Sequence, residues 1–217
     1  MRDYVPIGRF SYAQEGEDLI LARIMNSMPK NSSAGFFVDI GAHHPVRFSN
    51  TYYFYRRGWR GINVDPMPGT KDLFRRMRPK DITVECGIGP QSKSMTYYVF
   101  NESALNTFSE NEARKKNHPP YRILRTVQIP VITLKEMLDA HLPAGTSIDF
   151  MSIDTEGLDE EIVWSNDWNR YRPRVLLIEL LNMDLERTAN HPTCQFLRQQ
   201  GYQLQAKTFN TFFFVAP

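Results

Sequence analysis

Short apolar runs alternate with amphipathic stretches along this chain, a pattern that is typical of a β-sheet covered by helices. Residues 36–40 form a mostly apolar run that predicts a buried parallel strand, whereas apolar residues at helical spacing over 14–28 predict a helix. The same patterns predict further strands at 61–65, 82–86, 95–100, 127–134, 148–154, 175–180, 202–207 and 211–215. They predict further helices at 52–58, 71–78, 134–142, 157–164 and 193–200. The chain is therefore expected to have an α/β fold.

The last two predicted strands, 202–207 and 211–215, are separated by residues 208–210 alone. A crossover between parallel strands needs about a dozen residues, so these two strands must pair antiparallel. A mostly parallel sheet that closes with an antiparallel hairpin is the arrangement of S-adenosylmethionine (SAM) dependent methyltransferases. A dinucleotide-binding sheet does not usually end in this way.

The composition is that of a globular protein. The chain has 217 residues, 41% of them hydrophobic and 23% charged, which suffices to bury a core without disulfides. No apolar run is long enough to cross a bilayer, and the N-terminus lacks a secretory pattern. A net charge of +2 gives no overall attraction to nucleic acid. Cys86 and Cys194 fit no metal-binding spacing and are expected to stay reduced. We therefore expect a soluble, cytoplasmic protein that binds neither nucleic acid nor membranes.

Residues 1–217 are predicted to form one domain with two additions. Residues 1–33 are predicted to be an N-terminal helical appendage, because Pro29 and a polar stretch separate the first helix from the first strand. Residues 101–125 are polar and basic and contain Pro119-Pro120, which favours a loop or a lid.

Several predicted strands end in residues suited to binding a nucleotide-like ligand. Gly41 follows the first strand and permits a tight turn with close backbone approach, and Asp65 ends the second strand, where a carboxylate can accept hydrogen bonds from ribose hydroxyls. Cys86-Gly87 and Asp154 end two further strands, and ligands of open α/β sheets bind beyond these ends. The structural alternatives are that Asp39 only bonds nearby amides, that Asp65 only shapes the turn before Pro66, and that Cys86 only packs.

Six blocks of this sequence resemble the FkbM family of SAM-dependent methyltransferases. They run in family order from about residue 11 to about residue 205, so the match is more specific than any one block. The blocks are YAQEGED (12–18), DIGAHHP (39–45), SNT (49–51), GWRGINVDP (58–66), LNTF (105–108) and DTEG (154–157).

The resemblance implies a Rossmann-like class I methyltransferase fold, in which a mostly parallel seven-stranded sheet ends in a C-terminal antiparallel hairpin and carries helices on both faces. It also implies SAM as methyl donor and O-methylation of a sugar hydroxyl or a natural-product alcohol. The residues expected to bind the donor are Asp39, Gly41, Ala42, Asn50, Asp65, Pro66, Cys86 and Gly87. The glycine-rich loop of the wider superfamily keeps only its first glycine here, Gly41, as is usual in FkbM-like sequences.

Methylation of an alcohol requires removal of its proton by a general base or activation by a metal. Asp154 and Glu156 are the first candidates, because they follow a strand end and Gly157 permits a sharp turn there. Helix capping is the structural alternative for these acids. His43 and His44 are further candidate bases, since histidine titrates near neutral pH, although a loop histidine is often structural. Asp154 and Glu179 are candidate ligands of a divalent cation such as Mg²⁺.

The expected partner is a small-molecule or carbohydrate acceptor, including a nucleotide sugar, that enters beside residues 101–125. The basic run Arg114-Lys115-Lys116 could attract an anionic acceptor, but such runs are more often solvated. Two other functions stay open. One is a nicotinamide-dependent oxidoreductase or epimerase, which would require a GxGxxG loop that this sequence lacks. The other is an inactive SAM-binding partner subunit, against which the retained Asp154 and Glu156 argue.

Overall fold

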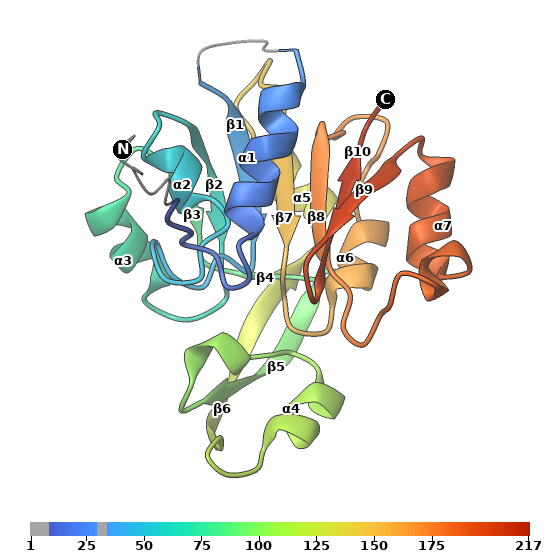
Figure 1. Ribbon diagram of the computed structural model, residues 1–217. Coiled ribbons are helices and arrows are strands. Elements are labelled where there is room, and N and C mark those ends of the chain that lie inside the picture. Colours follow the sequence, from blue (N-terminus) through green and yellow to red (C-terminus); the bar gives the residue numbers. More distant parts are fainter. Residues whose placement is uncertain (1–8, 30–33) are drawn as a thin grey trace, which may run out of the picture.

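The computed structural model describes residues 9–29 and 34–217. Seven strands form the main sheet in the order β3-β2-β1-β7-β8-β10-β9 (Figure 1). All neighbours pair parallel from β3 to β8, whereas β10 pairs antiparallel with both β8 and β9. The strands are β1 (Phe36–Ile40), β2 (Arg60–Val64), β3 (Ile82–Val84), β7 (Phe150–Ile153), β8 (Val175–Glu179), β9 (Gln203–Lys207) and β10 (Thr211–Val215). The predicted sheet and its terminal hairpin are thus confirmed.

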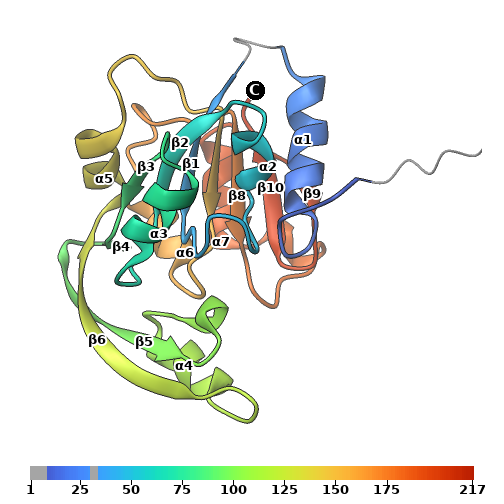
Figure 2. The same cartoon turned by 90° about the vertical axis from the view of Figure 1, so that its left-hand side faces the viewer.

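Helices cover both faces of this sheet, as predicted (Figures 1 and 2). On one face, α1 (Glu17–Ser27) and α2 (Tyr52–Tyr55) pack in an apolar cluster with side chains of β1, β7, β8 and β10. On the other face, α5 (Leu134–His141), α6 (Asp159–Trp164) and α7 (Pro192–Gln199) pack in a larger cluster. The remaining helical elements are α3 (Thr70–Met77), which contacts β3, and the short η2 (Arg187–Ala189). Because both faces are covered, strands such as β8 are apolar at successive positions rather than at alternate ones.

Helix α1 is part of the domain core rather than an appendage to it. Leu21 is fully buried, and it packs with Phe150 and Phe213 of the main sheet. The predicted appendage also included residues 1–8 and 30–33, which lie outside the described residues. The prediction separated the helix from the sheet because of the polar stretch after Pro29, but a polar connection does not prevent the helix from burying its apolar face.

Residues 87–132, here called the second unit, form a separate three-stranded sheet in the order β4-β6-β5 (Figure 2). Its strands are β4 (Gly87–Ile88), β5 (Lys93–Phe100) and β6 (Ile123–Ile132), and it includes η1 (Ser103–Leu105) and α4 (Glu110–Lys116). The sequence predicted extended segments here but no second sheet. The segment 101–125, predicted to be a loop or lid, contains η1, α4 and the start of β6, and its role as a lid stays a prediction.

No helix within the described residues combines the length and the apolar character needed to cross a membrane.

Candidate active site

A cavity of about 450 Å³ lies where the carboxyl ends of β1, β2 and β7 meet the second unit. The main sheet contributes Gly41, Asp65 and Asp154 to its wall, and the second unit contributes Tyr97 and Asn106. In open α/β sheets, ligands bind at this end of the strands. The cavity therefore lies where the sequence predicted a ligand site.

Gly41 makes a turn that no other residue could make without displacing its surroundings. Its φ angle is +82°, and a Cβ atom placed on it would lie 1.7 Å from the carbonyl oxygen of Asp154. The Gly41 and Ala42 amides both donate to the Val64 carbonyl, at 2.9 and 3.0 Å, which fixes the loop to β2. Gly41 lines the cavity, whereas Ala42 is buried beneath its wall. The turn therefore exposes bare backbone to the cavity.

Asp65 is buried at the end of β2 and accepts three hydrogen bonds. Its donors are the His43 amide at 2.9 Å, the Met67 amide at 2.8 Å and the Thr70 hydroxyl at 3.2 Å. Burial raises the pKa of Asp65, and these donors oppose that rise. Asp65 therefore shapes the turn before Met67, as the structural alternative predicted, and Asp65 and Pro66 also line the cavity. Two carboxylate oxygens can accept about four hydrogen bonds, which leaves capacity for a ligand hydroxyl.

The two histidines of the loop after β1 differ in their surroundings. His43 has a φ angle of +50°, and its Nε2 lies 2.9 Å from the Ser103 hydroxyl of the second unit. His44 Nδ1 accepts from the amides of Val46 and Arg47, each at 3.0 Å, so this nitrogen shapes the loop. Burial lowers the pKa of both imidazoles, and the Arg47 charge lowers it further. Both residues line the cavity, and the lowered pKa favours the neutral form of each imidazole.

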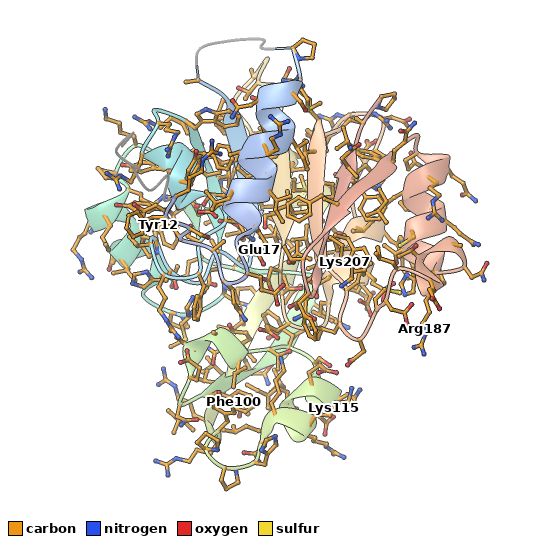
Figure 3. The ribbon with its side chains drawn as sticks, viewed as in Figure 1. Tyr12, Glu17, Phe100, Lys115, Arg187 and Lys207 are labelled. Carbon is orange, nitrogen blue, oxygen red and sulfur yellow. The ribbon has the colours of Figure 1, made fainter. Side chains whose placement is uncertain are left out.

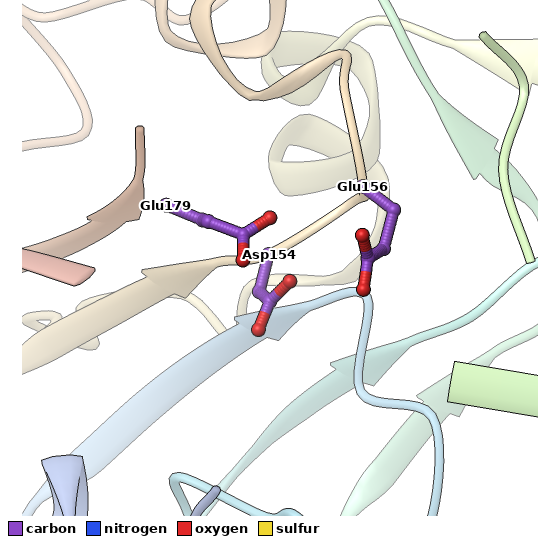
Figure 4. Close-up of side chains that lie close together, drawn as sticks. All are labelled: Asp154, Glu156 and Glu179. Atoms are coloured by element: carbon purple, nitrogen blue, oxygen red, sulfur yellow. The ribbon is translucent and has the colours of Figure 1, made fainter. Parts of the chain in front are cut away.

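Three acidic side chains meet at the ends of β7 and β8 and are here called the carboxylate cluster: Asp154, Glu156 and Glu179. One oxygen of each lies within 4.8 Å of one oxygen of each of the others, and Asp154 stands between the other two in Figure 4. Asp154 and Glu156 line the cavity. The proximity predicted for Asp154 with Glu156, and for Asp154 with Glu179, is therefore present.

Crowding and burial disfavour the charged forms in this cluster. Burial, followed by the charges of Glu156 and Asp159, raises the pKa of Asp154 well above its usual range. Burial and the charges of Asp154 and Glu156 raise the pKa of Glu179 to about 11, and Lys116 opposes this rise. Glu179 Oε2 is buried with no hydrogen-bond partner among the described residues. Oxygen ligands in this number and spacing suit a hard divalent cation.

The turn after β7 is held by Asp159 rather than by Asp154. Asp159 accepts from the Thr155 amide at 2.7 Å, the Thr155 hydroxyl at 3.1 Å and the Gly157 amide at 3.0 Å. Burial raises the pKa of Asp159 to about 6. Helix α6 has Leu158 at its N-cap and no side-chain cap, so the capping alternative proposed for Asp154 is wrong, and Asp154 and Glu156 both line the cavity.

Four predicted donor-site residues lie outside the cavity wall. Asp39 is buried and accepts from the Thr51 hydroxyl at 2.8 Å, and burial raises its pKa to about 6. Asn50 Nδ2 donates to the Ser152 hydroxyl at 3.0 Å. Gly87 packs against Phe108 and Val131, and Ala42 is buried. These four residues contact other buried residues of the protein instead of the cavity. Cys86 does line the cavity, and burial raises the pKa of its thiol to about 11, so it remains a protonated, packing side chain.

Sequence reasoning missed several residues of the site, chiefly in the second unit. Tyr97 of β5 lines the cavity, and Arg47 pairs with Glu102 through contacts of 2.9 and 3.0 Å. Lys116 pairs with Glu156 across 40 positions of sequence. The alternation of β5 could have placed Tyr97 on one face of a strand, but nothing in the sequence signals which partner Lys116 contacts.

Topology and site together agree with the arrangement that the sequence predicted, which is that of the SAM-dependent methyltransferases. The glycine turn after β1, the acidic end of β2 and the hairpin at β10 belong to one arrangement. The donor side also fits the group: bare backbone at Gly41, a carboxylate at Asp65 and the apolar side chains of Cys86 and Ile88 adjoin in one cavity.

The chain belongs to the FkbM methyltransferase family, because the profile of the Methyltransferase FkbM domain matches residues 39–204. No curated protein matches the sequence. The methyltransferase FkbM from Methylobacillus flagellatus KT is 13% identical, with a TM-score of 0.48, over 87% of this chain. This chain covers 45% of that protein's length. An O-methyltransferase from Bacillus cereus, solved with SAH, is 11% identical, with a TM-score of 0.46, over 98% of this chain and 84% of its own. A precorrin-6y C5,15-methyltransferase from Geobacter metallireducens GS-15 is 14% identical, with a TM-score of 0.45. The match covers 98% of this chain and 92% of that protein.

Proposed function

We propose that this chain is an O-methyltransferase that transfers the methyl group of SAM to a hydroxyl of a sugar, a glycan or a glycosylated small molecule. The observation that carries the proposal is the shared cavity, into which both the donor-side groups Gly41 and Asp65 and the carboxylates Asp154 and Glu156 open. A ligand held by the first pair would have its far end beside the second pair.

The donor-side residues would bind and orient SAM, which supplies a methyl group activated on a sulfonium. Gly41 offers backbone without a side chain, and Asp65 retains capacity to accept from ribose hydroxyls. Cys86 and Ile88 provide apolar surface on the same wall. In this proposal Asp39 and Asn50 act indirectly, by holding Thr51 and Ser152 in place.

The carboxylate cluster would activate the acceptor. In-line displacement requires the acceptor oxygen to be positioned and its proton removed, and positioning supplies much of the acceleration. Glu156 would accept the hydroxyl proton on its carboxylate, while Asp154 orients the hydroxyl. His43, which favours its neutral form, is the second candidate base. Asp154 and Glu179 would hold a divalent cation such as Mg²⁺, which would favour the deprotonated form of a bound hydroxyl.

The chemistry of the walls supports a hydroxyl-rich acceptor. Asp154 and Glu156 line one end of the cavity and offer acceptors to hydroxyl groups, and a negative charge on either of them repels an anionic group placed directly there. A nucleotide-sugar acceptor would have to place its phosphates elsewhere, and Arg47 and Arg76 line other parts of the wall. Both cysteines are free and buried, which is consistent with the expected cytoplasmic location.

The test is a screen of sugar nucleotides, glycans and glycosylated small molecules with isotope-labelled SAM, read by mass spectrometry. We expect one acceptor to gain about 14 Da with unlabelled SAM, because a methyl group replaces the hydroxyl proton, and to gain in addition the mass of the heavy isotopes with labelled SAM. A parallel series with a chelator separates activity that needs a cation from activity that does not. Protein that binds SAH but methylates only nitrogen, carbon or sulfur acceptors would contradict the proposal.

A further inference from the structure

The basic run Arg114-Lys115-Lys116 ends helix α4 in the second unit, and its first two members make only local pairs in the described structure. Arg114 contacts Glu110 at 2.5 Å, and Lys115 contacts Glu112 at 2.7 Å. Their side chains are 78% and 56% exposed, and Figure 3 marks Lys115 at the outer side of α4. Pairs at this spacing on one helix are typical of a solvated face.

Lys116 differs from both neighbours, because its ammonium contacts the Glu156 carboxylate of the main domain. The two side chains are only 19% and 21% exposed. Lys116 therefore brings a positive charge from the second unit to the carboxylate cluster. An ammonium that is mostly withdrawn from water binds its partner more firmly than an exposed one does.

The second unit also holds the backbone on which Glu156 stands. Glu156 has a φ angle of +58°, a conformation that residues with a side chain rarely adopt. The Thr107 hydroxyl donates to the Glu156 carbonyl at 2.7 Å. A Cβ atom on the next residue, Gly157, would lie 3.0 Å from Glu112 and 3.2 Å from Ser109, so the turn packs closely against α4. Backbone and side chain of Glu156 are thus both fixed by this unit.

The ion pair with Lys116 sets Glu156 apart from the other two members of the carboxylate cluster, while the Lys116 charge also acts at longer range on Glu179. Within residues 9–29 and 34–217, Asp154 and Glu179 form no ion pair with a lysine or an arginine, whereas Glu156 forms one with Lys116. A divalent cation that entered the cluster would be repelled by the ammonium, and it would have to displace Lys116 before Glu156 could serve as a ligand.

We propose that Lys116 is a positioning residue of the active site, which holds Glu156 toward the acceptor and keeps it out of the ligand set of a divalent cation at Asp154 and Glu179. This inference rests on the proposed function for the role of Glu156. It assigns to α4 a part in catalysis that the sequence does not signal, because the partner of Lys116 lies 40 residues further along the chain.

The first test is a titration of the protein with Mn²⁺, in which electron paramagnetic resonance measures the free Mn²⁺. It compares wild type with the variants Lys116→Met, Lys116→Arg and Lys115→Met. Lys116→Met removes the repelling charge and frees a third carboxylate, so we expect its Mn²⁺ affinity to rise at least about ten-fold. Lys116→Arg and the matched control Lys115→Met should bind as wild type does. Equal affinity of Lys116→Met and wild type, including no binding by either, would overturn the proposal. If Lys116→Met does not fold, Lys116→Gln provides the same comparison.

The second test measures kcat and the KM for SAM with an acceptor from the screen. Lys116→Met should lower kcat at least about ten-fold with the KM for SAM changed less than about two-fold, and Lys116→Arg should recover most of the loss. A purely structural role would change both constants or neither. The Mn²⁺ titration needs no acceptor, so the proposal about Lys116 can be decided even if no hydroxyl is methylated.

Discussion

The two ends of the cavity are built on opposite principles. At the end of β2, the buried Asp65 accepts from two amides and one hydroxyl, so its oxygens already have donors before any ligand arrives. At the ends of β7 and β8, Asp154 and Glu179 crowd together with Glu156, and Glu179 Oε2 has no hydrogen-bond partner among the described residues. The carboxylate at one end has several hydrogen-bond donors, whereas the carboxyl groups at the other end crowd one another and disfavour their charged forms.

In the proposed function, this difference separates the group that binds the donor from the groups that take part in the chemistry. A group that only has to hold a ligand can also stabilise the fold, because the same hydrogen bonds serve both ends. Carboxyl groups that exchange a proton or hold a cation must be partly unsatisfied before they act, and they reduce the stability of the folded state. Replacements at the two ends should therefore differ in their effects on stability and on activity.

The largest expected effect is that of Gly41→Ala on the donor side of the proposed site. A Cβ atom there would meet the Asp154 carbonyl oxygen at 1.7 Å, so the loop must move by more than an ångström. We expect SAH affinity, measured by calorimetry, to fall by at least about 100-fold. Gly58→Ala is the matched control, because Gly58 has a φ angle of +93° but open space around it. Equal SAH affinities in the two variants would show that the close approach at Gly41 is not required.

Asp154→Asn should break the chemistry while leaving binding intact. Loss of a carboxylate that orients or deprotonates the acceptor is expected to lower kcat by about 100-fold or more. SAH affinity should stay within about three-fold of wild type, because the donor-side contacts are untouched. Asp72→Asn, at an exposed position of α3, serves as the control. A variant with wild-type kcat would remove Asp154 from the reaction.

Asp65→Asn should weaken SAH binding and leave kcat almost unchanged, which is the reverse of the effect expected for Asp154→Asn. An amide in place of the carboxylate turns one acceptor into a donor and removes its charge, so SAH affinity should fall by about ten-fold and stability by about 1–2 kcal/mol. The kcat at saturating SAM should change little. Calorimetry and urea unfolding measure the two quantities, and unchanged SAH binding would exclude Asp65 from the donor site.

Glu179→Gln should have the smallest effect, and it should stabilise the folded protein, whereas Asp65→Asn should destabilise it. The folded-state pKa of Glu179 is raised from 4.5 to about 11, so its carboxyl favours folding below pH 4.5 and disfavours it progressively as the pH rises. A neutral amide removes this penalty, and we expect a gain of about 1–2 kcal/mol at pH 8 that vanishes near pH 4.5. Urea unfolding at both pH values tests this, and a variant less stable than wild type at pH 8 would contradict the proposed charge crowding.

The main sheet could be predicted because most of its strands, such as β1, β7, β8 and β10, are short apolar runs, and the three-residue connection after β9 allows only an antiparallel hairpin. The second unit could not. Its β4 has two residues, too few for any periodicity, and α4 buries only Ala113, so no apolar stripe identifies the helix. A short polar helix beside a proline pair is indistinguishable from a loop by its sequence pattern.

The part of the site that lies at the carboxyl ends of the strands could be predicted from the sequence. Gly41, Asp65 and Asp154 each follow a strand, and parallel strands bring their carboxyl ends to the same edge of the sheet. Whether a side chain faces the cavity or the core behind it could not be predicted, as Asp39 and Asn50 show by bonding to Thr51 and Ser152. Contacts between distant segments, such as Lys116 with Glu156, depend on tertiary packing that no local pattern encodes.

The second unit leaves the main sheet just after Cys86 and returns at Thr133, whose capping box starts helix α5 in the principal core. Both junctions are therefore anchored independently of what lies between them, while Gly41 and Asp65 belong to the scaffold outside. In the proposed function, replacing this segment by its equivalent from another family member would change the wall on the acceptor side, and the replacement would need a basic residue in place of Lys116 to keep the contact with Glu156. If that function holds, a change of acceptor would be concentrated in this one insertion, while the strands and helices of the main sheet would stay as they are.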